Sequence, residues 1–546
     1  MAGAALRPER RASWPALAAG ALVLDLALIQ PNHPGAMTWG ALRLFPLELP
    51  AILLGLAALG DRGLAPRLLR GTLAALLLAV AGLKLADLGT FTAFGRSFDP
   101  LVDLHLAPAG ARLLAGVLGL PLAILLAAGA LLALGLLAAA LLWAMRTWSR
   151  AGLPGPARMG AGLGALLFAG VSVAEVGLHA RAWTVPNPPG SAFTARVAWG
   201  HLRGALESRA AFAAFADAAR TDPWAGRTDL LDRLGDHDLL VVFIESYGRA
   251  SLDNPLYAPT HRATLEAAGP RLAAAGLAVR SGYLASPVQG GQSWLAHATL
   301  ASGLRIGDQR RFGALLASSR ATLWDLAAAS GRRTLAVAPA IVLPWPEGEL
   351  LGFQRRLAAA DLGYAGPPFN WVTMPDQYTL SAYEARRGEG PPVVGEIALI
   401  SSHAPWTPVP DLIPWDEVGD GHAFDAMARS GDPPAAVWAD DDRIRDHYRR
   451  SLDYSLRTVL DWAALPRDRP PLLVVLGDHP PAGFVSGLQS PDVPVHVIGP
   501  AALVAHLDAW GWAEGPVPDP GRPAWPMEAF RDRLIAALTS AEGPES

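Results

Sequence analysis

The chain has 546 residues, of which 51% are hydrophobic, and its mean hydropathy is +0.25. It is too long for one ordinary domain and too apolar for an ordinary soluble enzyme, so part of it is expected to lie in a membrane. A formal net charge of −4, with no basic tail, argues against nucleic acid as a partner. The absence of cysteine excludes disulfide bonds, thiolate metal sites and a cysteine nucleophile.

Residues 1–180 are predicted to form a transmembrane domain, because they hold nearly all of the long apolar runs. Each run is near or above the roughly 20 residues that cross a hydrocarbon core. The stretch from about Leu113 to Met145 is long enough for one span or two, and we favour one, with Gly119 and Pro121 marking a break after a short surface helix. The five candidate spans are about residues 14–30, 39–60, 71–91, 118–145 and 159–178.

The distribution of arginine predicts how these spans are oriented. Arginines cluster before the first span, between the second and third, and between the fourth and fifth, whereas the other loops carry only Arg96 and Arg112. By the positive-inside rule, the N-terminus is cytoplasmic and everything after residue 180 faces outward. Two spans within 113–145 would instead place the residues after 180 on the cytoplasmic side of the membrane. The clustered residues are Arg7, Arg10 and Arg11, then Arg62, Arg67 and Arg70, then Arg146, Arg150 and Arg158.

Residues 181–235 are interpreted as a connector. A breaker cluster at residues 186–190 precedes an alanine-rich amphipathic helix over about 191–220. From residue 236 to 546, short apolar runs alternate with helical patterns, which predicts an α/β domain with a mostly parallel central sheet. Strands are expected at 239–245, 277–284, 333–338, 396–402, 471–477 and 493–498, and helices near 293–303, 320–330, 440–463 and 527–540.

Two of these apolar runs end in residues that bind metals. The run from Leu239 leads into Glu245, and the run from Leu472 leads into Asp478 and His479. Ligand sites in open α/β sheets collect outside the carboxyl ends of the strands. Two carboxylates and an imidazole there indicate one divalent metal ion, and such ligands admit Mn, Mg or Zn. The structural alternatives are a helix-capping Glu245 and a surface turn at Asp478.

Ser293 opens a predicted helix directly after Gly290-Gly-Gln. Backbone N–H groups and the helix dipole favour an anion at such a position. The ordinary interpretation of a serine there is an N-cap. A bound divalent ion would change that interpretation, because it makes an alkoxide nucleophile accessible at neutral pH.

Three further residues are candidates for a pocket. His403 follows the strand that ends near Ile400, so it too emerges at a carboxyl strand edge, where it is either structural or functional. Trp345 and Asp376 are weaker candidates, since a packed aromatic and an N-cap are the favoured interpretations of these two residues.

Four short motifs occur in order after the five predicted spans: Phe243-Ile-Glu-Ser, Gly291-Gln-Ser, Ser402-His-Ala-Pro-Trp and Gly477-Asp-His. Together they resemble the sulfatase-like branch of the alkaline phosphatase superfamily. In layout the chain is most similar to the membrane phosphoglycerol and phosphoethanolamine transferases, including lipoteichoic acid synthase-like proteins. The resemblance covers the whole chain in architecture and about residues 236–500 in motifs.

The resemblance implies a role for each motif residue. A metal would be held by Glu245, Ser293, Asp478 and His479, and Ser293 would be the catalytic nucleophile. His403 would contact the substrate phosphate and act in catalysis, and Trp345 falls where a substrate-binding aromatic is expected. Such enzymes form a covalent phospho-enzyme by in-line attack and then pass the group to an acceptor hydroxyl or to water.

The sequence departs from the family pattern in three places. The nucleophile is serine where the membrane transferases usually have threonine. No Cys/Ser-x-Pro-x-Arg motif surrounds Ser293, which argues against a formylglycine sulfatase. No further histidine closely follows His479, so the transferred group stays open between phosphoglycerol and phosphoethanolamine.

The prediction is a bacterial inner-membrane enzyme with a bundle of five transmembrane helices and a periplasmic or extracellular sulfatase-like catalytic domain. It would move a phosphate-linked head group from a phospholipid donor to an envelope glycan or lipid acceptor. One alternative is a membrane-anchored phosphatase, phosphodiesterase or sulfatase-type hydrolase, in which water is the acceptor. A second alternative is a non-catalytic envelope assembly protein that binds no metal.

Overall fold

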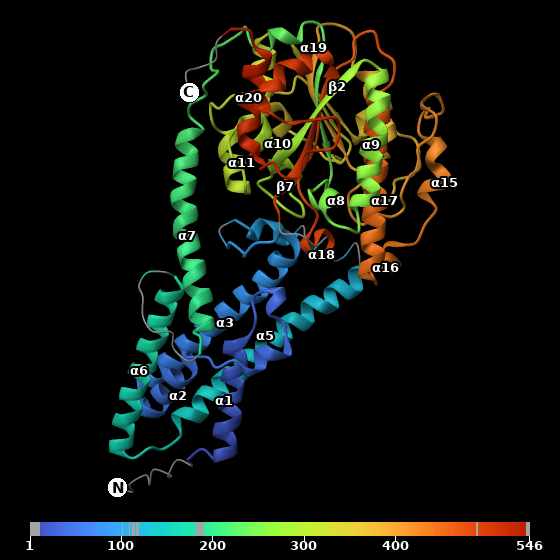
Figure 1. Ribbon diagram of the computed structural model, residues 1–546. Coiled ribbons are helices and arrows are strands. Elements are labelled where there is room, and N and C mark those ends of the chain that lie inside the picture. Colours follow the sequence, from blue (N-terminus) through green and yellow to red (C-terminus); the bar gives the residue numbers. More distant parts are fainter. Residues whose placement is uncertain are drawn as a thin grey trace. The chain divides into compact units, whose positions relative to one another are not determined.

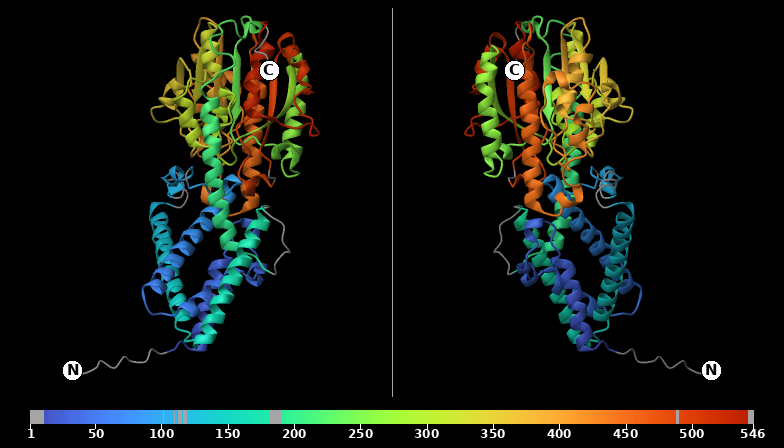
Figure 2. Two further views of the ribbon diagram at one scale, coloured as in Figure 1. Left: turned by 90° about the vertical axis from the view of Figure 1, so that its left-hand side faces the viewer. Right: turned by 90° about the vertical axis from the view of Figure 1, so that its right-hand side faces the viewer.

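The computed structural model has two compact units and describes residues 11–100, 102–108, 110–111, 115, 119–180, 182, 190–487 and 490–541 (Figures 1 and 2). We call Met1–Thr92 with Arg96–Ala210 the helical unit, and Ala93–Gly95 with Ala211–Ser546 the sheet unit. Several residues used in the sequence predictions lie outside the described residues: Arg7, Arg10, Arg112, Leu113 and 186–189 of the breaker cluster.

Among its described residues, the helical unit has five apolar helices at the places where spans are predicted. Three are long and apolar enough to cross a membrane, by length and composition: α3 (Leu64–Phe94), α5 (Leu120–Ser149) and α6 (Gly155–His179). The other two, α1 (Trp14–Ile29) and α2 (Glu48–Leu59), are apolar but have only 16 and 12 residues. A membrane domain is therefore present, and the count of five spans stays a prediction.

Residues 120–145 of the apolar stretch, for which one span or two were considered, lie in one continuous helix. α5 starts after Gly119, which has a left-handed φ of +82°, and Pro121 lies in the first turn of the helix. Proline is tolerated there because first-turn N–H groups have no intrahelical acceptor. Residues 120–149 thus agree with the single-span interpretation.

The helical unit has its own small apolar core. α1 packs against α5, and α2 packs against α6. Leucines from both pairs meet at a cluster that includes Leu28, Leu56 and Leu141. α7 (Phe193–Ala218) follows, and its residues up to Ala210 belong to this unit.

The sheet unit contains one mixed sheet whose strand order is β4-β3-β5-β1-β6-β7-β2-β8, with β9 beside β2. The five strands from β4 to β6 are mutually parallel, whereas β7 is antiparallel to both β6 and β2. The predicted, mostly parallel sheet is therefore confirmed. The strands are β1 Leu239–Ile244, β2 Leu277–Ala285, β3 Arg333–Ala338, β4 Arg355–Ala358, β5 Val393–Leu399, β6 Leu472–Gly477, β7 Asp492–Pro500, β8 Ala513–Glu514 and β9 Trp525–Pro526.

Helices cover both faces of the sheet, which explains why β1 and β6 are apolar throughout. Alternate residues of β1 point to opposite faces. Leu240, Val242 and Ile244 face the core under α9 (Ala258–Ala274), α14 (Asp376–Arg386) and α17 (Asp441–Ala463). The opposite core lies under α10 (Ser293–Ser302), α12 (Leu323–Ala329) and α20 (Phe530–Leu538). Figure 1 shows α9 and α17 on one side of β2 and β7, with α10 and α20 on the other.

Shorter helices connect these elements. They are α8 Ala250–Asp253, α11 Gln309–Leu316, α13 Glu347–Leu350, α15 Asp425–Ala428, α16 Pro434–Val437, α18 Gly483–Ser486 and α19 Ala501–Val504.

Strand β5 lies three residues earlier than the predicted 396–402. The cause is the buried carboxylate of Asp376, whose Oδ1 accepts hydrogen bonds from the backbone N–H groups of Ile400 at 2.8 Å and Ser401 at 2.9 Å. Those N–H groups therefore do not pair with a neighbouring strand, and β5 ends at Leu399. Asp376 is itself the first residue of α14 and not its N-cap.

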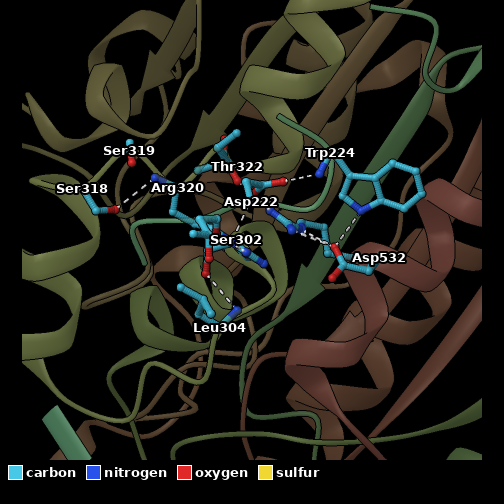
Figure 3. A network of polar contacts seen from close by, with 12 residues as sticks. Asp222, Trp224, Ser302, Leu304, Ser318, Ser319, Arg320, Thr322 and Asp532 are labelled. Carbon is cyan, nitrogen blue, oxygen red and sulfur yellow. Dashed lines mark hydrogen bonds and ion pairs between the residues drawn. The ribbon is translucent and has the colours of Figure 1, made fainter. Parts of the chain in front are cut away.

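A buried ionic network fixes the C-terminal end of α10 (Figure 3). Asp222 Oδ2 lies 3.1 Å from Nε of Arg320 and 2.8 Å from Nη1 of Arg531, and all three side chains are almost fully buried. Arg320 Nε also donates to the carbonyl of Ser302, the last residue of α10, at 2.8 Å. Trp224 extends the network, because its indole N–H donates to Asp532 at 3.1 Å. The helix that begins with Ser293 is therefore held at its far end.

Candidate active site

The three central strands end level with one another. Ile244, the last residue of β1, pairs with Leu399 of β5 on one side and with Gly477 of β6 on the other. The residues that follow these strands, including Glu245 and Asp478, therefore emerge side by side at one edge of the sheet. This is the edge at which the sequence predicts the site.

Glu245, Asp478 and His479 form a buried group whose ligand atoms all lie within 4.8 Å of one another. Nε2 of His479 is 3.2 Å from Oε1 of Glu245 and 3.7 Å from Oδ2 of Asp478. Two carboxylates and one imidazole are a donor set that suits a divalent ion such as Mn, Mg or Zn. The residues present therefore fit the predicted metal.

The hydrogen bonds of His479 fix which nitrogen faces the group. Nδ1 lies 2.9 Å from the carbonyl oxygen of Pro480. A carbonyl can only accept, so Nδ1 carries the proton and donates it. Nε2 therefore faces Glu245, and it is the nitrogen that would bind a metal.

The turns after β1 and β6 lock together. Oδ1 of Asp478 accepts from the backbone N–H of Ser246 at 2.8 Å and from that of His479 at 2.6 Å, which directs Oδ2 toward the site. Ser246 has a left-handed φ of 59°. The turns also touch through backbone, since a Cβ on Gly477 would lie 1.9 Å from the carbonyl oxygen of Tyr247. Only glycine fits at the end of β6.

Ser293 completes the group. It is the first residue of α10, after Gln292 in a left-handed conformation with φ of 67°. Its Oγ lies 3.1 Å from Oε2 of Glu245 and 3.2 Å from Nε2 of His479. The N-cap position belongs to Gln292, so the N-cap interpretation of Ser293 is wrong. The start of a helix is a position that favours a phosphate anion.

The electrostatics of the group call for a cation. Burial raises the pKa of Glu245, but the charges of His479 and His403 outweigh burial and leave that pKa well below its usual range. Burial and the neighbouring Glu245 raise the pKa of Asp478 to about 6. Burial lowers the pKa of His479, but Asp478 and Glu245 raise it to about 9. The protein thus places more negative charge here than its own groups neutralise, and a divalent ion would balance it.

His403 and Trp345 differ in their placement. His403 lies exposed in the turn after β5, and its charge acts on Glu245, so it borders the group without belonging to it. Trp345 is partly buried and packs on Phe353, with a ring-centroid distance of 6.1 Å. Its contribution to a substrate pocket stays a prediction.

His297 and Glu396 were not predicted from the sequence. His297 lies one turn after Ser293 on α10, and its Nδ1 is 2.9 Å from Oε1 of Glu396 on β5. Its ring stacks on Phe243 at 3.8 Å, and its buried Nε2 has no hydrogen-bond partner among the described residues. Two signals were available: the i, i+4 spacing from Ser293, and a carboxylate inside an otherwise apolar strand.

Two hydroxyl groups support the turn that carries Glu245. Ser402 Oγ donates to the carbonyl of Glu245 at 2.6 Å, and Tyr448 of α17 donates to the carbonyl of Ser246 at 2.9 Å. Both side chains are buried. In the sequence, Tyr448 is indistinguishable from the other apolar positions of an amphipathic helix.

No protein-family model matches the chain, and no curated protein sequence matches it. Among solved structures it is similar to the integral membrane lipooligosaccharide phosphoethanolamine transferase A of Neisseria meningitidis, with 14% identity, 97% of each chain covered and a TM-score of 0.47. It is also similar to the lipoteichoic acid synthase LtaP of Listeria monocytogenes, with 12% identity, 52% of this chain and 70% of that chain covered, and a TM-score of 0.35. A third is the phosphoglycerol transferase GacH of Streptococcus pyogenes, with 12% identity, 61% and 87% covered, and a TM-score of 0.33. The three are a phosphoethanolamine transferase, a lipoteichoic acid synthase and a phosphoglycerol transferase, which are the kinds of protein that the sequence motifs resemble.

Proposed function

We propose that the chain is a metal-dependent membrane transferase that moves a phosphate-linked head group, phosphoglycerol or phosphoethanolamine, from a phospholipid to an envelope glycan or lipid. The observation that carries this proposal is the placement of the Ser293 hydroxyl within 3.2 Å of both Glu245 and His479. A hydroxyl at a helix N-terminus, inside a buried set of metal-type ligands, is suited to attack phosphorus.

Glu245, Asp478, His479 and the Ser293 hydroxyl would hold the metal. When bound, the ion supplies charge stabilisation for the transferring phosphoryl group and favours the alkoxide form of Ser293. The metal-free geometry already prepares this role. Nε2 of His479 faces the group, and the hydroxyl proton of Ser293 is directed at a carboxylate, which can accept it.

The reaction would proceed in two displacements. Oγ of Ser293 forms a bond to phosphorus while the bond from phosphorus to the lipid oxygen breaks, and His403 would protonate the departing diacylglycerol oxygen. The N–H groups at the start of α10 stabilise the phosphoryl oxygens. An acceptor hydroxyl then forms a bond to phosphorus and gives its proton to His403, while the bond from phosphorus to Oγ of Ser293 breaks and Ser293 regains its proton from Glu245.

The apolar helices of the helical unit suit this chemistry. A phospholipid donor stays in the bilayer, so anchoring the catalyst there raises its local concentration relative to the donor. The arginine distribution supports a cytoplasmic N-terminus and a catalytic domain on the outer face of the bacterial inner membrane.

The experiment that tests the proposal is intact-mass analysis of the purified protein with a divalent metal and mixed bacterial phospholipids. We expect an adduct on Ser293, and its mass distinguishes glycerol phosphate from ethanolamine phosphate. The matched control is Ser293→Ala, which cannot form the ester. Bare phosphate, or free head-group phosphate released into water without an acceptor, would favour the hydrolase. Absence of both metal binding and adduct would favour the assembly protein and overturn the proposal.

A further inference from the structure

α10, the helix that begins with Ser293, is buried on almost all of its sides. Seven of its ten residues are buried, and five of those seven are alanine, serine or threonine. A helix at a protein surface has one apolar stripe, and that stripe determines which side of the helix faces the core. α10 has no such stripe, and its buried side chains are mostly small. Apolar packing therefore does not by itself fix the rotation of α10 about its axis, on which the direction of the Ser293 hydroxyl depends.

His297 is the one ionisable residue of α10, and its contacts have defined directions. Its Nδ1 lies 2.9 Å from Oε1 of Glu396 on β5. A carboxylate accepts, so Nδ1 donates. The imidazole ring stacks on Phe243 of β1, with 3.8 Å between the ring centroids and 12° between the ring planes. Each residue turns a helix by about 100°, so a rotation of α10 by one residue would break both contacts.

α10 contacts the chain of β1 at two levels. At the first, Oγ of Ser293 lies 3.1 Å from Oε2 of Glu245, and at the second the ring of His297 lies on Phe243. Glu245 continues the ladder of β1, because its N–H donates to the carbonyl of Leu399 at 3.1 Å. Phe243 and Glu245 are two residues apart and therefore point to the same face of the sheet. Four residues of helix rise about 6 Å and two residues of strand about 6.6 Å, so the two contacts fit together.

Stability alone does not explain a histidine at position 297. Its Nε2 is buried and has no hydrogen-bond partner among the described residues. In the neutral ring this nitrogen is an acceptor without a donor, and in the imidazolium it is a donor without an acceptor, and either state is destabilising. Apolar residues of similar volume in place of a buried ion pair are often neutral or stabilising. The pair of His297 and Glu396 is therefore suited to fixing a geometry and not to raising stability.

The charges around His297 strengthen its contact with Glu396. Burial lowers the pKa of His297, but the charge of Glu396 and the hydrogen bond to it outweigh burial and leave that pKa above its usual value. The charges of Asp478 and Glu245 act in the same direction. A hydrogen bond between an imidazolium and a carboxylate is stronger than one between neutral groups. The contact is therefore strong enough to select one orientation of α10.

We propose that His297, held by Glu396, is a positioning residue of the transfer reaction. It sets the rotation and depth of α10 and thereby directs the Ser293 hydroxyl toward Glu245 and His479, without touching the reacting atoms itself. The contact of Arg320 with the Ser302 carbonyl lies at the far end of the helix, nine residues from Ser293. This role rests on the proposed function, since it concerns the same nucleophile.

The test replaces the pair by apolar residues of similar volume, in the full-length protein with a divalent metal and mixed bacterial phospholipids. The double variant His297→Leu/Glu396→Val should melt at or above the wild-type temperature, because no buried charge is left unpaired. Its kcat for head-group transfer should fall at least about tenfold, since a misplacement of about 1 Å costs about 100-fold. KM for the phospholipid should stay near the wild-type value, because the pair does not contact the substrate.

Two single variants separate positioning from stability. Glu396→Gln is the conservative change, because its amide oxygen still accepts from Nδ1 of His297, and it should keep most of the wild-type kcat. Thr264→Val is the matched control. It removes the hydrogen bond from Thr264 to Asp453, which joins α9 to α17 on the other face of the sheet, and should lower stability without changing kcat.

An experimental structure of the double variant gives a readout that does not need turnover. Oγ of Ser293 should lie beyond hydrogen-bond distance of Oε2 of Glu245, compared with 3.1 Å in the wild type. Wild-type protein that transfers no head group would refute the proposed function, and this structure would still decide the role of His297. An unchanged kcat in the double variant, a fall in kcat matched by a fall in stability, or a Ser293 hydroxyl that has not moved would overturn the positioning role.

Discussion

Oγ of Ser293 lies 3.2 Å from Nε2 of His479, although 186 residues separate them in the chain. The contact joins the start of a helix to the turn after β6, and Glu245 closes the triangle from the turn after β1. Each of the three comes from a different element, so their convergence is not a by-product of local sequence. The expected effects of replacing Ser293, of removing metal and of replacing Glu245 all depend on this arrangement.

Replacing Ser293 by alanine should abolish turnover while leaving the fold intact. Removal of a nucleophile costs at least about 10³-fold in kcat, whereas loss of one part-buried hydroxyl costs about 1 kcal/mol of stability. The measurement is head-group release from phospholipid, together with the melting temperature. Ser293→Thr should keep measurable activity, since it retains the hydroxyl, and a fully active alanine variant would contradict the assigned role.

Chelation should lower stability, and metal should restore it. An ion that binds only the folded protein adds about 2.7 kcal/mol at a concentration 100 times its Kd. The sheet unit should therefore melt at a higher temperature with Mn, Mg or Zn than with EDTA. Glu245→Gln should remove most of this difference. The control is Glu207→Gln, which alters an exposed ion pair of the helical unit with Arg203. A metal effect of equal size in both variants would count against the site.

His496 should make the fold sensitive to mild acid. Burial lowers its pKa to about 3. Both nitrogens of its neutral ring are hydrogen-bonded. The Ser281 hydroxyl donates to the carbonyl of Gly515, so it accepts from Nδ1 of His496 at 2.9 Å. Nε2 accepts from the hydroxyl of Tyr247 at 2.9 Å. Below pH 6.5, His496 binds a proton in the unfolded chain but stays neutral in the folded chain. Stability is therefore lost as the pH falls from 6.5 toward 3, by about 2 kcal/mol at pH 5.

The measurement for His496 is the free energy of unfolding between pH 7 and pH 5. His496→Gln should start lower but lose less over this interval than the wild type does. His506→Gln serves as the control, because that histidine is exposed and should leave the slope unchanged. Parallel slopes for wild type and His496→Gln would rule out the buried imidazole as the cause.

Asp222→Asn should destabilise the sheet unit by about 3 kcal/mol or more, because it leaves Arg320 and Arg531 buried without their shared counter-ion. Denaturant unfolding checks this. Asp217→Asn provides the comparison, since its ion pair with Arg220 is 76% exposed on both sides and should contribute less than about 1 kcal/mol. Similar losses in the two variants would show that the network is not stabilising.

The sequence predicts the strands that carry the site because β1 and β6 are continuous apolar runs that end in charged residues, a local signal. It predicts α10 for a similar reason, since two glycines lie just before the serine that begins it. It does not predict the end of β5, because Asp376 is distant in sequence and takes the N–H groups of Ile400 and Ser401. The His297–Glu396 pair was missed for the same reason: only the folded sheet brings the two residues together.

The order of the strands sets when the proposed active site can assemble during synthesis of the chain. β1 is the first strand made, yet both of its neighbours, β5 and β6, come later in the chain. Glu245 can therefore meet Asp478 and His479 only after β6 has been made. The Asp478 carboxylate that accepts from the N–H of Ser246 follows it by 232 residues in the chain. Catalytic competence is thus among the last properties that the emerging chain acquires. A truncated or stalled product that ends before β6 carries Ser293, the proposed nucleophile, but cannot assemble the centre that would activate it.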